Sequence, residues 1–156
     1  MRKTNTMRRW LLMLVLLALW FPGASAETKT FTMNNSTFGL STGQNNDDQT
    51  ATNAPITIVI SKGEGTYGAN YQTGHIRFQA NNTMTISVSG DYKLTSVTIS
   101  TNSSNPLDNA SVSVGSYNTS TQVWTAPSTA TTEVIITTEN NLLGCHRCVA
   151  TCCRFI

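Results

Sequence analysis

The sequence predicts an all-β protein, an antiparallel two-sheet β-sandwich of jelly-roll-like type that follows an N-terminal signal peptide. Short segments beyond residue 27 alternate apolar and polar residues with a period of two, as half-buried strands do. Gly, Asn, Asp and Ser separate these segments at spacings near ten residues, and no segment between them has a helical period. Such a pattern favours a sandwich or jelly roll, with a closed barrel as second choice.

An apolar N-terminal segment predicts export. Four basic residues precede it: Arg2, Lys3, Arg8 and Arg9. The apolar run 10–21 is shorter than the roughly 20 residues that a spanning helix needs, and "ASA", which ends at Ala26, is a small-residue cleavage signal. We therefore expect a signal peptide at 1–26, a mature chain that begins at Glu27 without a stable membrane span, and a secreted or cell-surface location.

Charge and composition narrow the class of partner. Four of the ten basic residues lie in 1–26, so six basic and eight acidic residues remain, a formal charge of −2. No basic patch is left for nucleic acid or for an anionic membrane surface. The 130 residues after the leader include 24 Thr, 14 Ser and 14 Asn, residues that suit pleated surfaces and turns. The regular alternation argues against intrinsic disorder.

Eight segments are the expected strands. They occupy 28–33, 56–61, 75–80, 84–90, 92–100, 111–114, 122–124 and 132–138. The in-phase apolar residues predict a core that contains Phe31, Ile58, Phe78, Ile86, Val88, Ile99 and Ile136. Within 92–100 the apolar phase changes between Leu94 and Val97, which predicts a β-bulge near Thr95 and Ser96. The polar stretch 34–55 predicts a functional or mobile loop, with a short strand around Phe38 to Leu40.

The order of motifs between residues 28 and 138 supports a family resemblance. "KTFTM" and a Gly- and Asn-rich excursion precede "ITIVISKGEG", and then come "NYQTGHIRFQANNTMTIS", "GDYKLTSVTIST", "QVWTAPS" and "EVIITT". This order resembles a β-sandwich accessory module of exported surface proteins of Gram-negative gut anaerobes. The resemblance implies a module for adhesion or glycan contact, and no motif in it is catalytic. In such modules a final alternating strand follows the "EVIITT" strand and completes the sheet.

The C-terminal tail departs from that pattern. All four cysteines lie within nine residues, at Cys145, Cys148, Cys152 and Cys153. A zinc site, disulfides or free thiols, and an aberrant or out-of-frame terminus are the open interpretations. Adjacent cysteines seldom chelate one ion, and bridges within so short a segment would close very small loops. We therefore expect a domain at 27–140 and an atypical tail at 141–156 that fills the last strand position poorly. Replacing all four cysteines by serine is then expected to leave stability unchanged.

Aromatic and amide side chains are the candidate ligand contacts. Rings that stack on sugar faces are sought in or near turns, and the candidates are Tyr67, Tyr71, Tyr117 and Trp124, with Arg77 beside them. Each has core packing as the competing interpretation. Asp47 and Asp48 in "NNDDQ" offer oxygen ligands for calcium, although a solvated loop is the favoured interpretation.

No catalytic set of residues is recognisable. Asp47 and Asp48 are adjacent and point to opposite sides of an extended chain, and neither histidine has an evident partner. We therefore expect a non-catalytic binding or adhesion module without a cofactor, which contacts a glycan or a host or surface protein. A structural β-module truncated from a larger surface protein is the alternative. The expected state is a monomer or part of a larger surface assembly.

Overall fold

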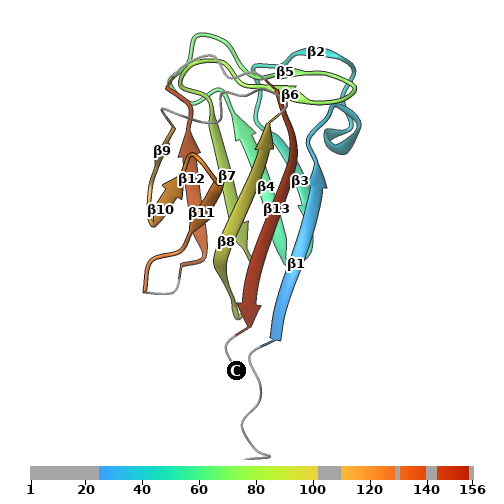
Figure 1. Ribbon diagram of the computed structural model, residues 1–156. Coiled ribbons are helices and arrows are strands. Elements are labelled where there is room, and N and C mark those ends of the chain that lie inside the picture. The colour runs from blue at the N-terminus through green and yellow to red at the C-terminus, as the bar shows by residue number, and fades with distance from the viewer. Residues whose placement is uncertain (1–24, 102–109, 129–130, 140–143, 155–156) are drawn as a thin grey trace, which may run out of the picture.

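The computed structural model describes residues 25–101, 110–128, 131–139 and 144–154. They form two antiparallel β-sheets packed face to face, which confirms the predicted sandwich (Figure 1). Helical structure in these ranges is one 3-10 turn, η1 (Ser36–Phe38), and no helix there has the length and apolar character to cross a membrane. The predicted signal peptide lies outside the described residues, apart from the first two residues of β1 (Ser25–Thr32).

Sheet A contains eight strands and sheet B five. Sheet A has the order β10 (Ser116–Asn118), β11 (Val123–Thr125), β8 (Tyr92–Thr101), β13 (Cys145–Arg154), β6 (Ile76–Arg77), β5 (Asn70–Tyr71) and β2 (Gly43–Gln44), with β1 also paired to β13. Sheet B has the order β3 (Gln49–Asn53), β4 (Ile56–Ser61), β7 (Thr83–Val88), β12 (Glu133–Thr137) and β9 (Ser111–Val112). Every predicted segment contains a strand, although 75–80 contributes only the two residues of β6.

The C-terminal tail is part of the sandwich, so the predicted domain boundary at residue 140 is wrong. β13 lies between β1 and β8 and is antiparallel to both. Its register with β1 runs from Arg147 opposite Thr32 to Arg154 opposite Ser25. The segment therefore occupies the final strand position. The expectation that it would fill this position poorly is wrong.

Three of the four cysteines face the core. Cys145, Cys148 and Cys152 are buried, together with Ala150 between them. A dense group of cysteines in a sequence indicates reactive or metal-binding thiols, whereas a buried thiol packs as a small apolar side chain. With that assignment Cys148, Ala150 and Cys152 alternate with the half-buried Val149 and Thr151 as an ordinary strand does.

Two β-bulges shift the alternation of inward- and outward-facing residues within a strand, so that residues three positions apart both face the core. Ser96 pairs with Thr151 and Leu94 pairs with Cys152, so Thr95 is the extra residue, which confirms the predicted bulge. Because of it, Leu94 and Val97 are both buried although three positions separate them.

The second bulge, on β13, was not predicted. Cys145 pairs with Thr101 and Arg147 with Ser100, which leaves His146 as the extra residue. The carbonyl of His146 accepts a hydrogen bond from the Met33 amide, just beyond the end of β1. This bulge explains the spacing of three between Cys145 and Cys148: both side chains face the core.

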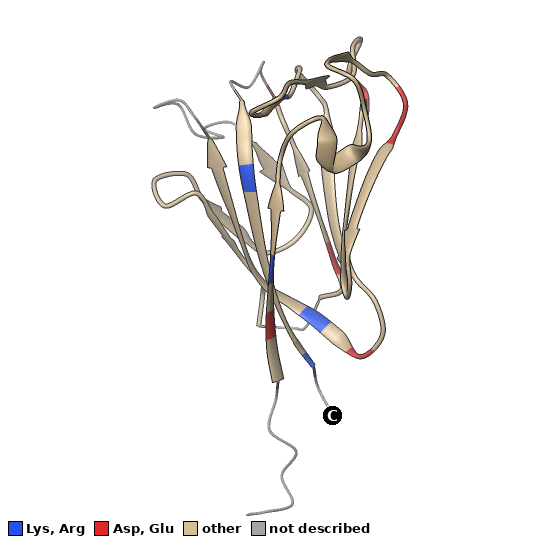
Figure 2. Ribbon diagram, turned by 90° about the vertical axis from the view of Figure 1, so that its right-hand side faces the viewer, with Lys and Arg blue, Asp and Glu red and all other residues tan. Residues whose placement is uncertain are grey.

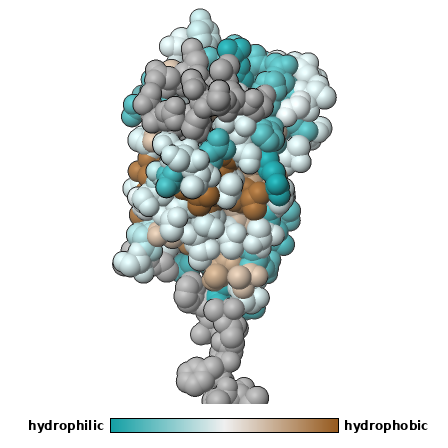
Figure 3. All heavy atoms as spheres, in the orientation of Figure 1, coloured by the Kyte–Doolittle hydropathy of each residue, from teal (hydrophilic) through white to brown (hydrophobic). Residues whose placement is uncertain are grey.

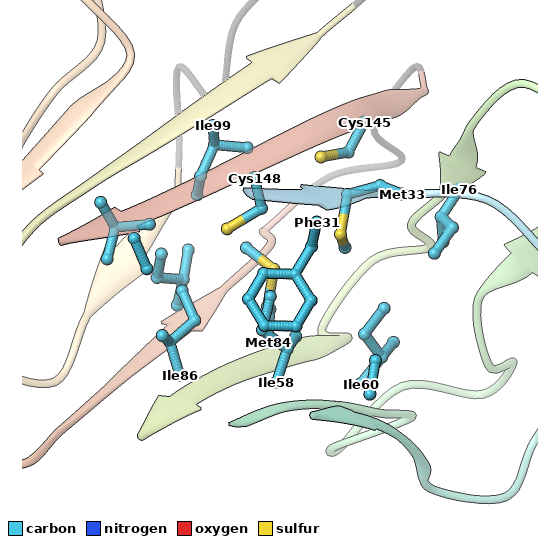
Figure 4. Packing of buried hydrophobic residues seen from close by; sticks show 14 of the residues in the cluster. Phe31, Met33, Ile58, Ile60, Ile76, Met84, Ile86, Ile99, Cys145 and Cys148 are labelled. Atoms are coloured by element: carbon cyan, nitrogen blue, oxygen red, sulfur yellow. The ribbon is translucent and has the colours of Figure 1, made fainter. Parts of the chain in front are cut away.

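The core is a continuous apolar layer between the sheets. Figure 4 shows Phe31, Met33, Ile99, Cys145 and Cys148 on one side facing Ile58, Ile60, Met84 and Ile86 on the other. Of the predicted core residues, Phe31, Ile58, Phe78, Ile86, Ile99 and Ile136 are buried. Val88, the last residue of β7, is only half-buried.

The polar stretch 34–55 is more ordered than predicted. The expected strand near Phe38 is the 3-10 turn η1, because the Asn34 side-chain oxygen accepts hydrogen bonds from the Thr37 amide at 3.0 Å and the Ser36 hydroxyl at 2.9 Å. Phe38 is buried under this turn. Residues 49–53 then form β3, an edge strand that pairs with β4.

The buried thiols make a stability prediction that reverses the sequence-based one. We expect Cys148→Ser to lower the free energy of unfolding by about 1–3 kcal/mol, because it places a hydroxyl without a designed partner in an apolar layer. Urea unfolding under reducing conditions measures the change. The matched control is Cys153→Ser, which alters the half-exposed neighbour on the other face and should change the free energy by less than about 0.5 kcal/mol. Equal effects of the two substitutions would show that β13 does not pack as described.

Candidate functional site

The chain enters and leaves the described sandwich at one end, and loops gather at the other. Ser25 pairs with Arg154 at the first end, while β2, β5 and β6 lie at the opposite end (Figure 1). We call residues 34–48 and 62–82, which form this second end, the loop pole.

Two of the predicted ligand contacts are core residues, so those predictions are wrong. Trp124 is fully buried, and its ring nitrogen donates a hydrogen bond to the Val114 carbonyl at 2.6 Å. Tyr71 is 1% exposed and packs edge-on against Phe38, with ring centroids 5.5 Å apart. Burial raises the pKa of Tyr71 strongly, and the charge of Asp48 adds to the effect. Both rings sit in strands whose inward phase the sequence pattern alone did not resolve.

The other predicted contacts lie at the surface or partly at it. Arg77 is exposed on β6, where it pairs with Asn70 of β5. Tyr117 of β10 is half-buried and packs against the core. Tyr67 is 59% exposed, and it is the one large apolar side chain classed as exposed among the described residues.

The backbone on the carbonyl side of Tyr67 is fixed by a buried amide. The side-chain nitrogen of Asn82 donates to the Tyr67 carbonyl at 2.7 Å and to the Lys62 carbonyl at 3.2 Å. Its side-chain oxygen accepts from the Gln79 amide at 2.9 Å, and Asn82 itself is fully buried. Because all of these partners are backbone groups, one side chain ties both ends of the loop 62–67 to the body of the sandwich.

A second loop fixes the residue that follows Tyr67. The Gly68 amide donates to the Asn46 side-chain oxygen at 2.8 Å, and the Asn45 amide donates to the Ala69 carbonyl at 3.0 Å. A Cβ atom at Gly68 would lie 1.8 Å from the Asn45 carbonyl oxygen, so only glycine permits this approach. Tyr67 is therefore an exposed ring on a braced backbone, a geometry that suits contact with a ligand.

Asn82 is the residue that sequence reasoning missed. It lies between the predicted strands 75–80 and 84–90, and its neighbour Asn81 is exposed. Nothing in the local pattern separates these two asparagines. The contacts of Asn82 come from Lys62 and Tyr67, which are distant in the sequence, so only the folded chain identifies it.

Charged residues are sparse, and they lie at both ends of the molecule and at a few places along the strands (Figure 2). At the end of the sandwich opposite the loop pole, Glu27 forms an ion pair with Lys29 at 3.2 Å and accepts a hydrogen bond from the Tyr92 hydroxyl. That hydrogen bond, followed by the one from Lys29, lowers the pKa of Glu27. Asp47, Asp48 and Glu64 are exposed in the loops of the opposite pole. The face of the molecule seen in Figure 3 is mostly mildly polar, with strongly hydrophilic areas and small apolar patches between them.

The cysteines have the properties of structural thiols. All four are free, and burial raises the pKa of Cys145 to about 12 and that of Cys148 well above its usual value. The thiolate is the reactive and metal-binding form, and burial suppresses it here. In the described ranges no group of three His, Cys, Asp or Glu side chains is placed to hold a metal ion, around the β13 cysteines or around Asp47 and Asp48.

Comparisons of the chain with protein-family models, with curated proteins and with solved structures found no match. The loop pole is therefore the region from which we infer a function.

The bracing role of Asn82 is testable by its removal. We expect Asn82→Ala to lower the free energy of unfolding by about 1–3 kcal/mol, because two carbonyls and one amide lose a buried partner. Amide hydrogen exchange in 62–68 should also become faster. Asn118→Ala, at an exposed position on β10, is the control and should cost less than about 1 kcal/mol. Unchanged exchange in 62–68 would contradict the bracing.

The buried thiols predict a loss of stability at alkaline pH. The pKa of Cys145 and Cys148 is raised in the folded chain, so above the unfolded value of about 9 the unfolded state releases protons that the folded state keeps. The contribution of these thiols to stability should therefore be constant below that pH and fall above it, by up to ~1.4 kcal/mol per pH unit for each thiol. Urea unfolding between pH 8 and 10 measures the slope. A double Cys145→Ala/Cys148→Ala variant should have a smaller slope, and an equal slope would show that other groups cause it.

Proposed function

We propose that the protein is a non-catalytic, secreted or cell-surface binding module that contacts glycans through Tyr67. The observation that carries this proposal is the exposure of the Tyr67 ring on a loop whose backbone is held on both sides. An ordered aromatic ring presents a flat apolar face without a large loss of conformational freedom on binding. The apolar face of a sugar ring is a matching surface.

Polar groups near the ring supply the second requirement of sugar recognition. Asn46 holds Gly68, and Thr66 is exposed directly before Tyr67. Amide and hydroxyl groups of this kind pair with sugar hydroxyls, and side-chain hydrogen bonds around an apolar contact are how small-molecule sites gain orientation.

The architecture supports the same function. The described chain enters and leaves at the end opposite the loop pole, so a module joined to a larger assembly at that end would present Tyr67 outward. The absence of a recognisable catalytic set in the sequence agrees with binding without turnover. Secretion, as predicted from residues 1–26, would place the module where extracellular glycans are found.

A paired substitution at Tyr67 tests the proposal. The probes are an array of glycans and host-matrix proteins. We expect Tyr67→Ala to weaken glycan binding at least about tenfold, because stacking of a flat ligand on one aromatic ring is worth about 1–3 kcal/mol. Tyr67→Phe keeps the ring and should retain most of the binding.

The fold serves as the internal control for this experiment. Tyr67 is exposed, so both variants should unfold at the same urea concentration as the original chain within about 0.5 kcal/mol. Binding that is lost in neither variant, or a chain that binds no glycan on the array, would contradict the proposal. That result would favour the structural β-module instead.

A further inference from the structure

The charges around Tyr67 differ from those of the rest of the loop pole. Asn46, which holds Gly68, is followed directly by Asp47 and Asp48, and both carboxylates are exposed. A Cβ atom at Gly68 would lie 2.8 Å from the Asn46 Cα, so the two loops are in contact at the residue beside Tyr67. The acidic pair therefore follows directly on the residue that holds Gly68, the chain neighbour of Tyr67.

A third carboxylate comes from the loop of Tyr67 itself. Glu64 is exposed in the turn that the Gly65 amide closes by donating to the Lys62 carbonyl at 3.0 Å. The Asn82 amide that holds Lys62 also holds Tyr67, so this turn and the ring belong to one braced unit. Figure 2 shows acidic segments on the upper loops, with no basic segment drawn among them on that side.

The basic residues of the loop pole are placed differently. Lys62 is half-buried at the base of the loop, and Arg77 lies on β6 beyond the β5–β6 turn. In the loop of the ring and in the loop packed against it, the exposed charged side chains are thus three carboxylates, Asp47, Asp48 and Glu64. An anionic ligand on the Tyr67 ring would meet the net negative charge of these two loops.

From this placement we infer that the ligand of the Tyr67 surface is an uncharged glycan, and that Asp47, Asp48 and Glu64 exclude sulfated, sialylated or uronate-containing glycans. The inference rests on the proposed function, because it concerns the ligand of the same ring. Like charges at separations below the Debye length of about 8 Å repel in physiological salt. Specificity then arises from repulsion of the wrong ligand as much as from attraction of the right one.

Matched glycan pairs test this specificity. The probes are immobilised neutral oligosaccharides and the same oligosaccharides that carry a sulfate or a terminal sialic acid. We expect the original chain to bind the charged member of each pair about tenfold more weakly, a difference of about 1.4 kcal/mol. Raising the NaCl concentration from about 0.05 to about 0.5 M should reduce that difference, because salt screens exposed charges.

Neutralising variants identify the residues responsible. Asp47→Asn/Asp48→Asn/Glu64→Gln should bind both members of a pair within about twofold of each other. The control, Asp91→Asn/Glu133→Gln, removes exposed acids outside the loop pole and should keep the original preference.

The outcomes separate the two proposals. Tyr67-dependent binding that is equal or stronger for the charged glycans overturns the inference and leaves the proposed function standing. A preference that persists in the neutralised variant, or disappears in the control, also overturns it. Glycan binding that does not depend on Tyr67, or no glycan binding at all, overturns the proposed function and the inference with it.

Discussion

The pairing of β13 with β1 on one side and β8 on the other connects the parts of sheet A. β1 has β13 as its partner, and β6, β5 and β2 join β8 and its neighbours through β13. Without this strand, β8 and β1 would face each other across a gap with unpaired backbone groups, which are costly when buried and prone to pairing with other chains when exposed. Sheet B would at the same time lose the apolar surface that Cys148 and Cys152 contribute to the layer between the sheets.

The cysteines of β13 show how packing and reactivity compete for the same residue type. A dense group of thiols indicates metal or disulfide chemistry when it is seen only as a sequence. In the fold three of them line the apolar layer, and desolvation keeps Cys145 and Cys148 protonated. The spacing of three between them, which resembles one half of a zinc motif, results from the bulge at His146. Their role is to fill volume: Cys148, for example, lies in sheet A between its cross-strand neighbours Phe31 and Ile99, and its small thiol packs beside these larger side chains.

The structure of the loop pole depends on buried polar groups that are hydrogen-bonded to one another. Asn82 is surrounded by backbone amides and carbonyls that have no other strand to pair with, and its side chain satisfies several of them at once. A network of this kind is stable only when every member is paired, and it is rigid for that reason. The network includes the Tyr67 carbonyl, so it holds the backbone that carries the exposed ring. The proposed binding at this ring and the proposed exclusion of anions therefore both depend on one local arrangement.

The sequence by itself determined the class of fold, the positions of eight strands and most of the core, but not β2, β3, β5, β10 or β13. Alternation with a period of two survives in any sandwich, and the change of phase between Leu94 and Val97 is a local consequence of the bulge at Thr95. Tertiary structure alone decided the rest. Whether Trp124 and Tyr71 face the ligand or the core depends on which side of the strand the second sheet covers, and a period of two does not distinguish the sides. The place of β13 depends on strands that are distant in the chain, and so does the burial of Asn82, because long-range pairing leaves no mark on the residues nearby.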